Sequence, residues 1–128
     1  MTEASSVRET IEKYLDGWRT GDRDAWLSLF SEDAVLVDPV GAPANEGRDA
    51  IATFWDRVHQ LPMVFEPQIE RIVVCGTEAM ALFRMESRAA EGAGGMSIDI
   101  VDTFEVNEAA EITKLKAYWD NKCMKPLS

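Results

Sequence analysis

In four successive segments of the second half of the chain, apolar and polar residues alternate as they do in β-strands. This succession of strands constrains the fold more than any other feature of the sequence. The four segments cover residues 64–75, 79–88, 96–106 and 112–120, with short turn-forming segments between them. Alternation gives each strand one face for a core and another for solvent or a partner. Strands joined by short connections pair antiparallel, so we expect a meander. Pro67 suggests that its strand lies at an edge or carries a bulge.

Three helical patterns precede these strands. The first begins at a capping box, with Ser6 as the N-cap and Glu9 three residues later, and it ends at Gly21. Asp22 caps a second, short helix, and Gly47 precedes a third, which closes before proline. The apolar positions that identify the three helices are Val7, Ile11, Tyr14, Leu15 and Trp18; Ala25, Trp26, Leu29 and Phe30; and Ile51, Phe54, Trp55 and Val58.

A short apolar strand is expected at residues 34–38, between the second and third helices, and a turn at residues 39–43. Helices followed by a run of strands indicate an α+β fold with helices on one face of a curved sheet. A length of 128 residues corresponds to a single domain, 1–128, in which we expect residues 1–5 to be disordered. The glycine-rich segment 92–95 is expected to be a hairpin turn and not a phosphate loop, because no helix follows it.

The charge balance narrows the choice of partners. Thirteen basic and 23 acidic residues give a net charge of −10. Such a surface repels phosphate backbones and anionic membranes, so nucleic acid and lipid headgroups are poor candidates. No apolar segment approaches the roughly 20 residues that a membrane helix needs. A small neutral molecule or a partner protein fits better.

The cysteine and histidine content narrows the chemistry. Cys75 and Cys123 lie far apart, and without a recognisable secretory signal we expect reduced thiols and a cytoplasmic location. His59 is the single histidine, and the chain has neither a CxxC nor an HExxH motif, so we expect no metal site. We expect His59 to be a solvated residue at a helix end.

Three polar side chains fall on faces that should be buried: Tyr14, Asp38 and Asp102. A buried polar group without a partner costs roughly 2–7 kcal/mol in transfer measurements, so each of them needs an explanation. The structural alternatives are a core tyrosine bonded to a backbone carbonyl, an Asp38 that caps the following turn, and an Asp102 paired with an arginine such as Arg84. The functional alternative is that the three groups share a site.

Asp102 is the most informative of the three, because counting every second residue places it on an otherwise apolar face. The other members of that face are Met96, Ile98, Ile100, Phe104 and Val106. Asp99 points to the opposite face, where we expect solvent. Burial among apolar side chains raises the pKa of an aspartate, because the ionised form is desolvated. The resulting neutral acid is a hydrogen-bond donor.

An apolar, aromatic cavity should surround these groups. Its predicted lining on the concave side of the meander is Phe83, Met85, Leu115, Ala117 and Trp119, with Trp18 and Trp55 contributed by the helices. A base, an acid and a phenol in such a cavity can transfer a proton next to a carbonyl group. Asp38 would be the base, while Tyr14 and Asp102 would donate hydrogen bonds to the enolate oxygen.

These residues resemble those of the bacterial steroid Δ5-3-ketoisomerases, within the superfamily of nuclear transport factor 2 and the SnoaL-type polyketide cyclases. The matching segments are Tyr14, Gly21–Asp22, Leu29–Ala34, Val37–Gly41, Gly47–Arg48, Ile100–Asp102 and Ala117–Trp119. The resemblance implies a cone-shaped fold in which a curved mixed sheet wraps around a long helix, usually as a homodimer packed sheet to sheet. It also implies a small hydrophobic substrate and no cofactor.

The resemblance further implies a reaction and a role for each residue. The family moves a double bond of a 3-oxo steroid from the 5,6 to the 4,5 position through a dienolate. Its general base falls on Asp38, its oxyanion donors on Tyr14 and Asp102, and its pocket-wall tryptophan on Trp119. An aspartic acid kept neutral as a donor is the known arrangement in these isomerases themselves.

One departure leaves the substrate open. Many members have a second tyrosine on the third helix, bonded to the oxyanion tyrosine, and Trp55 stands at that position here. An indole donates a hydrogen bond but has no hydroxyl to accept one. Two alternatives therefore stay open. One is another enzyme of the same fold, such as a polyketide cyclase or a dehydratase of a ring ketone. The other is a non-catalytic module that binds a hydrophobic ligand or a protein.

Overall fold

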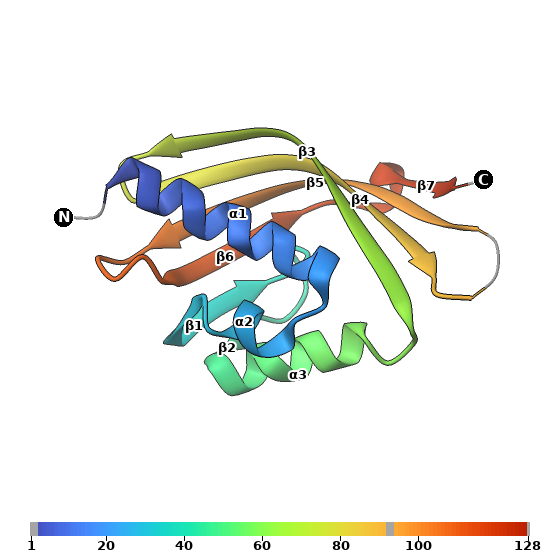
Figure 1. Cartoon of the computed structure of the whole chain (residues 1–128), viewed down its shortest axis with the longest axis horizontal. Coiled ribbons are helices and arrows are strands. Elements are labelled where there is room, and N and C mark those ends of the chain that lie inside the picture. The colour runs from blue at the N-terminus through green and yellow to red at the C-terminus, as the bar shows by residue number, and fades with distance from the viewer. Residues whose placement is uncertain (1–2, 92–93, 128) are drawn as a thin grey trace.

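A computed structural model of the chain describes residues 3–91 and 94–127. Helix α1 (Ala4–Thr20) lies along the concave side of a curved sheet (Figure 1). It begins earlier than predicted, with Glu3 and not Ser6 as its N-cap, because the N–H group of the fully buried Val7 donates to the Glu3 carbonyl. The predicted capping box is therefore absent, and Ala4 and Ser5, expected to be disordered, are helical; residues 1 and 2 lie outside the described part.

The other two helices confirm the predicted caps and correct one boundary. In α2 (Arg23–Leu27) the Asp22 carboxylate accepts the Ala25 N–H at 3.1 Å, and α3 (Arg48–Val58) follows Gly47, whose φ of 89° favours glycine. Phe30 was expected on the second helix but begins a strand, because it pairs in parallel with Ile112.

Seven strands form one sheet. They are β1 (Phe30–Val37), β2 (Asn45–Glu46), β3 (Met63–Cys75), β4 (Glu78–Ala89), β5 (Gly95–Val106), β6 (Ile112–Tyr118) and β7 (Met124–Leu127), with a 3-10 turn, η1 (Asn121–Cys123), before β7. Their order is β2-β1-β6-β5-β4-β3, and β7 pairs with β5. The predicted antiparallel meander from β3 to β6 is confirmed. The parallel pairing of β1 with β6 makes the sheet mixed, as the resemblance implied.

The details of the meander also agree with the sequence. Strand β3 is an edge strand with a bulge between Ile69 and Arg71, as Pro67 suggested. Arg88 pairs with Gly95, so a hairpin joins β4 to β5, although residues 92 and 93 of its turn lie outside the described part. The two shortest strands, β2 and β7, were not predicted.

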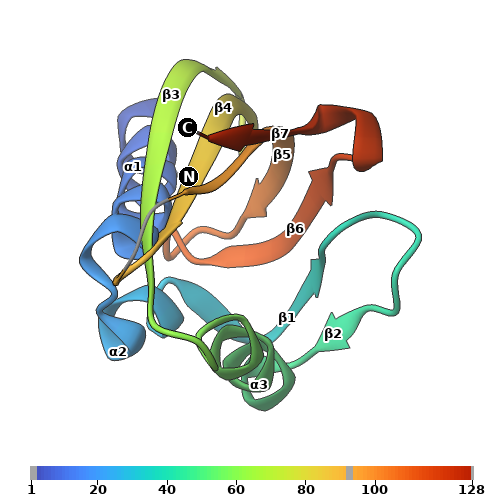
Figure 2. The ribbon, with the colours of Figure 1, turned by 90° about the vertical axis from the view of Figure 1, so that its right-hand side faces the viewer.

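The sheet bends around α1, and α2 and α3 lie on the same concave side (Figure 2). Along β5, Phe104 and Val106 are buried in the apolar core, whereas Ile98 and Ile100 face a cavity. The same division runs along α1, from Ile11 in the core to Trp18 beside the cavity. The fold is therefore filled at one end and hollow at the other.

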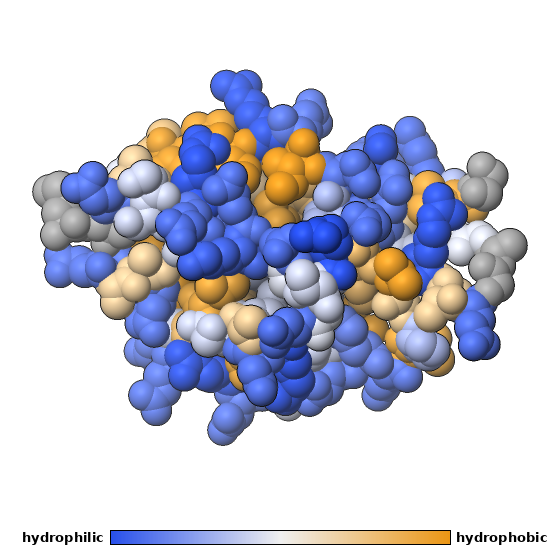
Figure 3. All heavy atoms as spheres, in the orientation of Figure 1, coloured by the Kyte–Doolittle hydropathy of each residue, from blue (hydrophilic) through white to orange (hydrophobic). Residues whose placement is uncertain are grey.

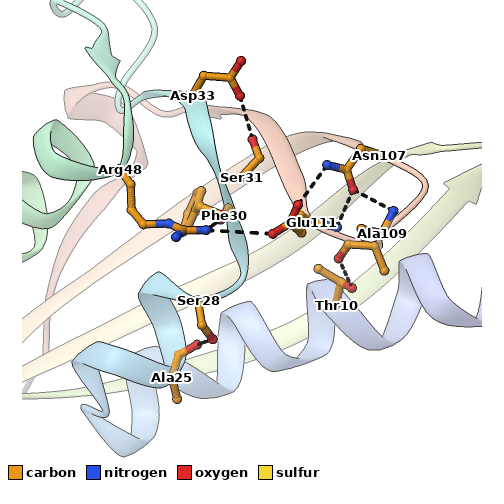
Figure 4. Close-up of polar contacts among 11 residues, drawn as sticks. Thr10, Ala25, Ser28, Phe30, Ser31, Asp33, Arg48, Asn107, Ala109 and Glu111 are labelled. Carbon is orange, nitrogen blue, oxygen red and sulfur yellow. Dashed lines mark hydrogen bonds and ion pairs between the residues drawn. The ribbon is translucent and has the colours of Figure 1, made fainter.

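Polar contacts close the filled end (Figure 4). Thr10 on α1 donates to the Ala110 carbonyl at 2.8 Å. Arg48, at the start of α3, donates to the Phe30 carbonyl and lies 3.9 Å from Glu111. These contacts join α1, α3, β1 and the turn between β5 and β6 at a place where no cavity-lining residue lies.

Hydrophilic side chains cover much of the face in Figure 3, with apolar patches between them. None of the described helices is both long and apolar enough to span a membrane. Cys75 and Cys123 are free thiols.

Candidate active site

A cavity of about 190 Å³ lies between α1, α3 and the concave face of the sheet. It is lined by Tyr14, Trp18, Asp38, Phe54, Val58, Phe65, Phe83, Met85, Ile98, Ile100, Asp102 and Trp119. The lining contains two carboxyl groups, a phenol and an indole N–H in otherwise apolar surroundings. All three predicted catalytic side chains therefore face one space.

Asp102 lies in the wall of this cavity and is only 2% exposed. Its strand neighbours are Ala81 on β4 and Ala117 on β6, whose small side chains leave room above the carboxyl group. Burial raises the pKa of Asp102 well above its usual range, and the charge of Asp38 raises it further. These surroundings favour the protonated form of the carboxyl, which can donate a hydrogen bond.

The face assignment of β5 is confirmed. The β4–β5 register has no shift between Met96 and Asp102, and Asp99 is exposed. Arg84 pairs with Asp99 across the strands and donates to Glu86 at 3.2 Å. The alternative in which Arg84 neutralises Asp102 is therefore wrong.

Asp38 directly follows β1 and is partly buried at the cavity. The Trp119 indole N–H donates to its Oδ1 atom at 2.8 Å. Burial raises the pKa of the Asp38 carboxyl, and the hydrogen bond from Trp119 opposes that rise. Among the described contacts its side-chain bond is to Trp119 and not to the following turn, so the turn-capping alternative is not supported.

The parallel pairing of β1 and β6 brings Asp38 and Trp119 together across 81 residues of sequence. Val37 pairs with Lys116, and the Val40 N–H donates to the Ala117 carbonyl at 2.8 Å. Both strands end at this point, so the residues that directly follow them, Asp38 and Trp119, meet at the cavity.

Tyr14 lies on α1, 2% exposed, with ring contacts to Trp18, Trp26, Phe30 and Phe104. Its pKa is raised well above the usual value, first by burial and then by the charges of Asp102 and Asp38, while a hydrogen bond from Trp18 lowers it. The hydroxyl therefore keeps its proton and can donate a hydrogen bond to a ligand oxygen.

Similarity to known proteins agrees with this geometry. The model of the SnoaL-like domain matches residues 11–115, most of the chain. The chain belongs to the SnoaL-like domain family. It is 26% identical to a steroid Delta-isomerase of Nocardioides simplex over 116 residues, which is 91% of each chain.

Solved structures show the same cone fold as this SnoaL-like chain. The Δ5-3-ketosteroid isomerase of a Mycobacterium species superposes with a TM-score of 0.83 at 25% identity, covering 95% of this chain and 98% of that one. The epoxide hydrolase/cyclase-like enzyme SalBIII superposes with a TM-score of 0.85 at 21% identity, covering 99% and 100%. A Mycobacterium tuberculosis protein in complex with estradiol-17beta-hemisuccinate superposes with a TM-score of 0.80 at 22% identity, covering 94% and 98%.

Three of the residues predicted to line the cavity do not line it in this SnoaL-like protein, and one of them, Ala117, is 1% exposed and pairs with Asp102. Leu115 is fully buried and pairs with Phe104, at the filled end of the cone. Trp55 is 3% exposed and packs behind Trp18, against Trp26 and His59. The other predicted residues, Trp18, Phe83, Met85 and Trp119, line it as expected.

Five lining residues were not singled out from the sequence: Phe54, Val58, Phe65, Ile98 and Ile100. Four of them carried a signal, because Phe54 and Val58 are one helical turn apart on an apolar stripe, and Ile98 and Ile100 share the face of Asp102. Alternation identified the face of each element but not how far along it the cavity extends.

Proposed function

We propose that this SnoaL-like protein is a cofactor-independent isomerase that moves the double bond of a 3-oxo-Δ5-steroid to the Δ4 position. The observation that carries the proposal is the pair of carboxyl groups in one apolar cavity: Asp38 accepts a hydrogen bond from an indole N–H, and Asp102 is almost completely buried. Two titratable groups with different environments suit a base and an acid. The similarity to a steroid Delta-isomerase over most of both chains supports it.

In the proposed reaction Asp38 moves the proton in both steps, while Tyr14 and Asp102 stabilise the intermediate. The Asp38 carboxylate takes the proton from C4, and the electrons of the broken C–H bond move into a dienolate. Tyr14 and Asp102 donate hydrogen bonds to its oxygen, where the negative charge develops. The protonated Asp38 then gives its proton to C6, which completes the shift of the double bond and restores the carboxylate.

The volume of the cavity bears on how a steroid would bind. At about 190 Å³ it is smaller than the roughly 300–1,000 Å³ typical of pockets that enclose a whole drug-sized ligand. We propose that the reacting rings enter the cavity, with the carbonyl toward Tyr14 and Asp102, and that the remaining rings lie at its mouth.

We extend the proposal to a homodimeric, cytoplasmic protein. The outer face of the sheet carries a groove of about 560 Å³ that includes Leu82, Val101 and Tyr118. Tyr118 is 43% exposed there, and a twin chain packed across a two-fold axis would cover this surface. The two free thiols support a reducing compartment.

The test is direct. The protein is mixed with 5-androstene-3,17-dione and the absorbance of the conjugated enone product is followed. We expect a rise that is lost in Asp38→Asn by about 10²–10⁴-fold in kcat, because a positioned general base contributes that much. Asp99→Asn, which removes an exposed carboxylate from the opposite face of β5, is the matched control and should retain activity. No rise with wild-type protein would favour another ring-ketone enzyme or a binding module.

A further inference from the structure

Three aromatic rings from different parts of the fold meet at one side of the cavity. Trp18 comes from α1, His59 directly follows α3, and Phe65 lies near the start of β3. Phe65 meets Trp18 at 5.5 Å between ring centres and 72° between planes, and it meets His59 at 5.3 Å and 66°. His59 in turn stacks on Trp18 at 12° between planes. We call these three residues the aromatic wall.

The cavity ends at the aromatic wall. Trp18 and Phe65 belong to its lining, whereas His59, in contact with both of them, does not. The two lining rings therefore stand between the space for a ligand and the histidine. Strand β3 leaves the end of α3 and runs up past α1 (Figure 2), so the wall closes the place where these three elements meet.

The three rings of the wall are held to different degrees. Trp18 is 7% exposed, and its ring also contacts Trp26 and Trp55. His59 stacks on Trp55 at 4.0 Å, and its Nδ1 atom lies 2.8 Å from the Trp55 carbonyl oxygen. Phe65 is partly exposed on the edge strand β3, and its ring contacts among the described residues are with Trp18 and His59. It is therefore the ring whose removal disturbs the core least.

The volume of the cavity indicates what the aromatic wall excludes. A cavity of roughly 150 Å³ with an apolar lining encloses a single benzene ring. The cavity of this protein, at about 190 Å³, is only somewhat larger. It therefore has room for two fused rings of a ligand, and the third and fourth rings of a steroid do not fit behind the wall.

We propose that the aromatic wall limits the cavity to two fused rings and that Phe65 is the residue that sets this length. The oxygen of the ligand lies toward Tyr14 and Asp102, and rings beyond the second stay outside, where they bury little apolar surface. As an isomerase, the protein then accepts two-ring ketones and gains little from the remaining rings of a steroid. The consequence for turnover rests on the proposed function, but the consequence for ligand binding does not.

Two phenols of different length test the proposal. 2-Naphthol has two fused rings, and equilenin carries the same naphthol unit within a four-ring skeleton, so only the length differs. Both affinities are measured by fluorescence titration. In Phe65→Ala the space of the removed ring joins the cavity. We expect the preference for equilenin over 2-naphthol to rise about tenfold, the scale of burying two further methylene-sized groups.

Three further variants control for folding and for a general gain of space. Phe65→Leu has an intermediate side chain and should give a smaller rise, which keeps the test open if the alanine variant does not fold. Phe54→Ala removes an identical ring from the lining on α3, away from the ring contacts of the wall, and should not raise the preference. Val64→Ala, on the opposite face of β3 and 48% exposed, should change neither affinity. An unchanged preference in the Phe65 variants, or an equal rise in Phe54→Ala, would overturn the proposal.

Turnover separates this proposal from the proposed function. With 5-androstene-3,17-dione, Phe65→Ala should lower KM and leave kcat within about threefold, because the added contacts lie away from the reacting atoms and stabilise substrate and transition state alike. A protein that shows the Phe65-dependent preference but does not isomerise the steroid would overturn only the proposed function. An active isomerase whose preference for equilenin stays unchanged in the Phe65 variants would overturn only the role of the aromatic wall.

Discussion

At the scale of single residues, the two aspartates of the cavity differ because of what surrounds each carboxyl group. Asp102 has alanines on both neighbouring strands and is almost completely buried, so its ionised form is strongly disfavoured. Asp38 is less buried and accepts the Trp119 N–H, which stabilises its ionised form. The surroundings thus favour the protonated form of Asp102 more strongly than that of Asp38.

Trp119→Phe should shift the pH dependence of the proposed reaction. The hydrogen bond from Trp119 lowers the pKa of Asp38, so its loss raises that pKa further. Because the base must be ionised, the acid limb of kcat/KM against pH should move to higher pH. Asp99→Asn serves as the control for long-range charge and should leave the limb in place. A limb that stays or moves to lower pH in Trp119→Phe would contradict the assignment of Asp38.

Asp102 substitutions should separate its role from that of Asp99. Loss of one oxyanion donor typically costs about 10²–10³-fold. We expect kcat to decrease from wild type to Asp102→Asn, which keeps an N–H donor, and then to Asp102→Ala. Asp99→Asn and Asp99→Ala should remain within about threefold of wild type, since surface substitutions have small effects. Steady-state kinetics on the four variants checks the order, and equal rates for both Asp102 variants and wild type would exclude the donor role.

Asp102 should also reduce stability at neutral pH. Its pKa in the folded protein is raised, so the folded state keeps a proton that the unfolded chain releases above about pH 4. Stability is therefore fully present below the unfolded pKa and is lost as the pH rises toward the folded pKa. Asp102→Asn does not titrate, so its free energy of unfolding relative to wild type should increase from pH 4 to pH 8. Urea unfolding across this range measures the difference, and a pH-independent difference would argue against a buried neutral acid.

At the scale of elements, α1 is placed by close contact with α2. A Cβ atom built on Gly17 would lie 2.8 Å from a ring carbon of Trp26, which is fully buried. Glycine at this position lets the two helices approach closely enough for Trp26 to pack on Tyr14. The position of Tyr14 thus depends on a residue without a side chain.

Gly17→Ala should therefore destabilise the protein, although it improves helix propensity. Alanine gains roughly 0.5–1 kcal/mol over glycine inside a helix, whereas overpacking a core costs typically 1–3 kcal/mol. We expect a net loss on the order of 1 kcal/mol in urea unfolding. Glu12→Ala, on the exposed side of the same helix, should be close to neutral. A Gly17→Ala protein that is more stable than wild type would show that the Trp26 ring moves freely.

At the scale of the whole molecule, two hollows lie on opposite faces of one sheet. The concave face holds the cavity with Tyr14, Asp38 and Asp102, and the convex face carries the larger groove with Leu82, Val101 and Tyr118. Phe83 and Ile100 border both hollows, so a partner on the outer groove would lie one strand thickness from the cavity. Assembly and ligand binding would then share the same strands.

The protein should sediment as a species of twice 14.3 kDa at micromolar concentration. Val101→Glu places a charge in the outer groove and should shift the population to monomer, because an unpaired charge in an interface is costly. Glu105→Lys, at an exposed position of the same strand, serves as the charge-change control. A wild-type protein that sediments only as a monomer would exclude the proposed dimer.

Particular residues show where prediction from the sequence succeeded. Alternation along β5 placed Asp102 inside and Asp99 outside, and the absence of a register shift between Met96 and Asp102 is what made the count valid. Helical spacing placed Tyr14 and Trp18 on the inner face of α1. The edge strand was predictable because Pro67 has no backbone N–H to donate. The helix cap was predictable because the Asp22 carboxylate accepts an N–H group three residues later.

The sequence by itself determined which face of each element is buried, because side-chain direction repeats with a fixed period along helices and strands. Only the tertiary structure decided how far the cavity runs along those faces. Leu115 and Trp55 lie on the inner faces of their elements but are buried in the core, whereas Ile98 and Phe65 line the cavity. It also decided which groups meet, such as Asp38 with Trp119 through a parallel pairing, and Tyr14 with Trp18 instead of Trp55. The period of side-chain direction is a local property of the chain. The extent of the cavity and the contacts between its residues depend on how segments far apart in sequence pack together.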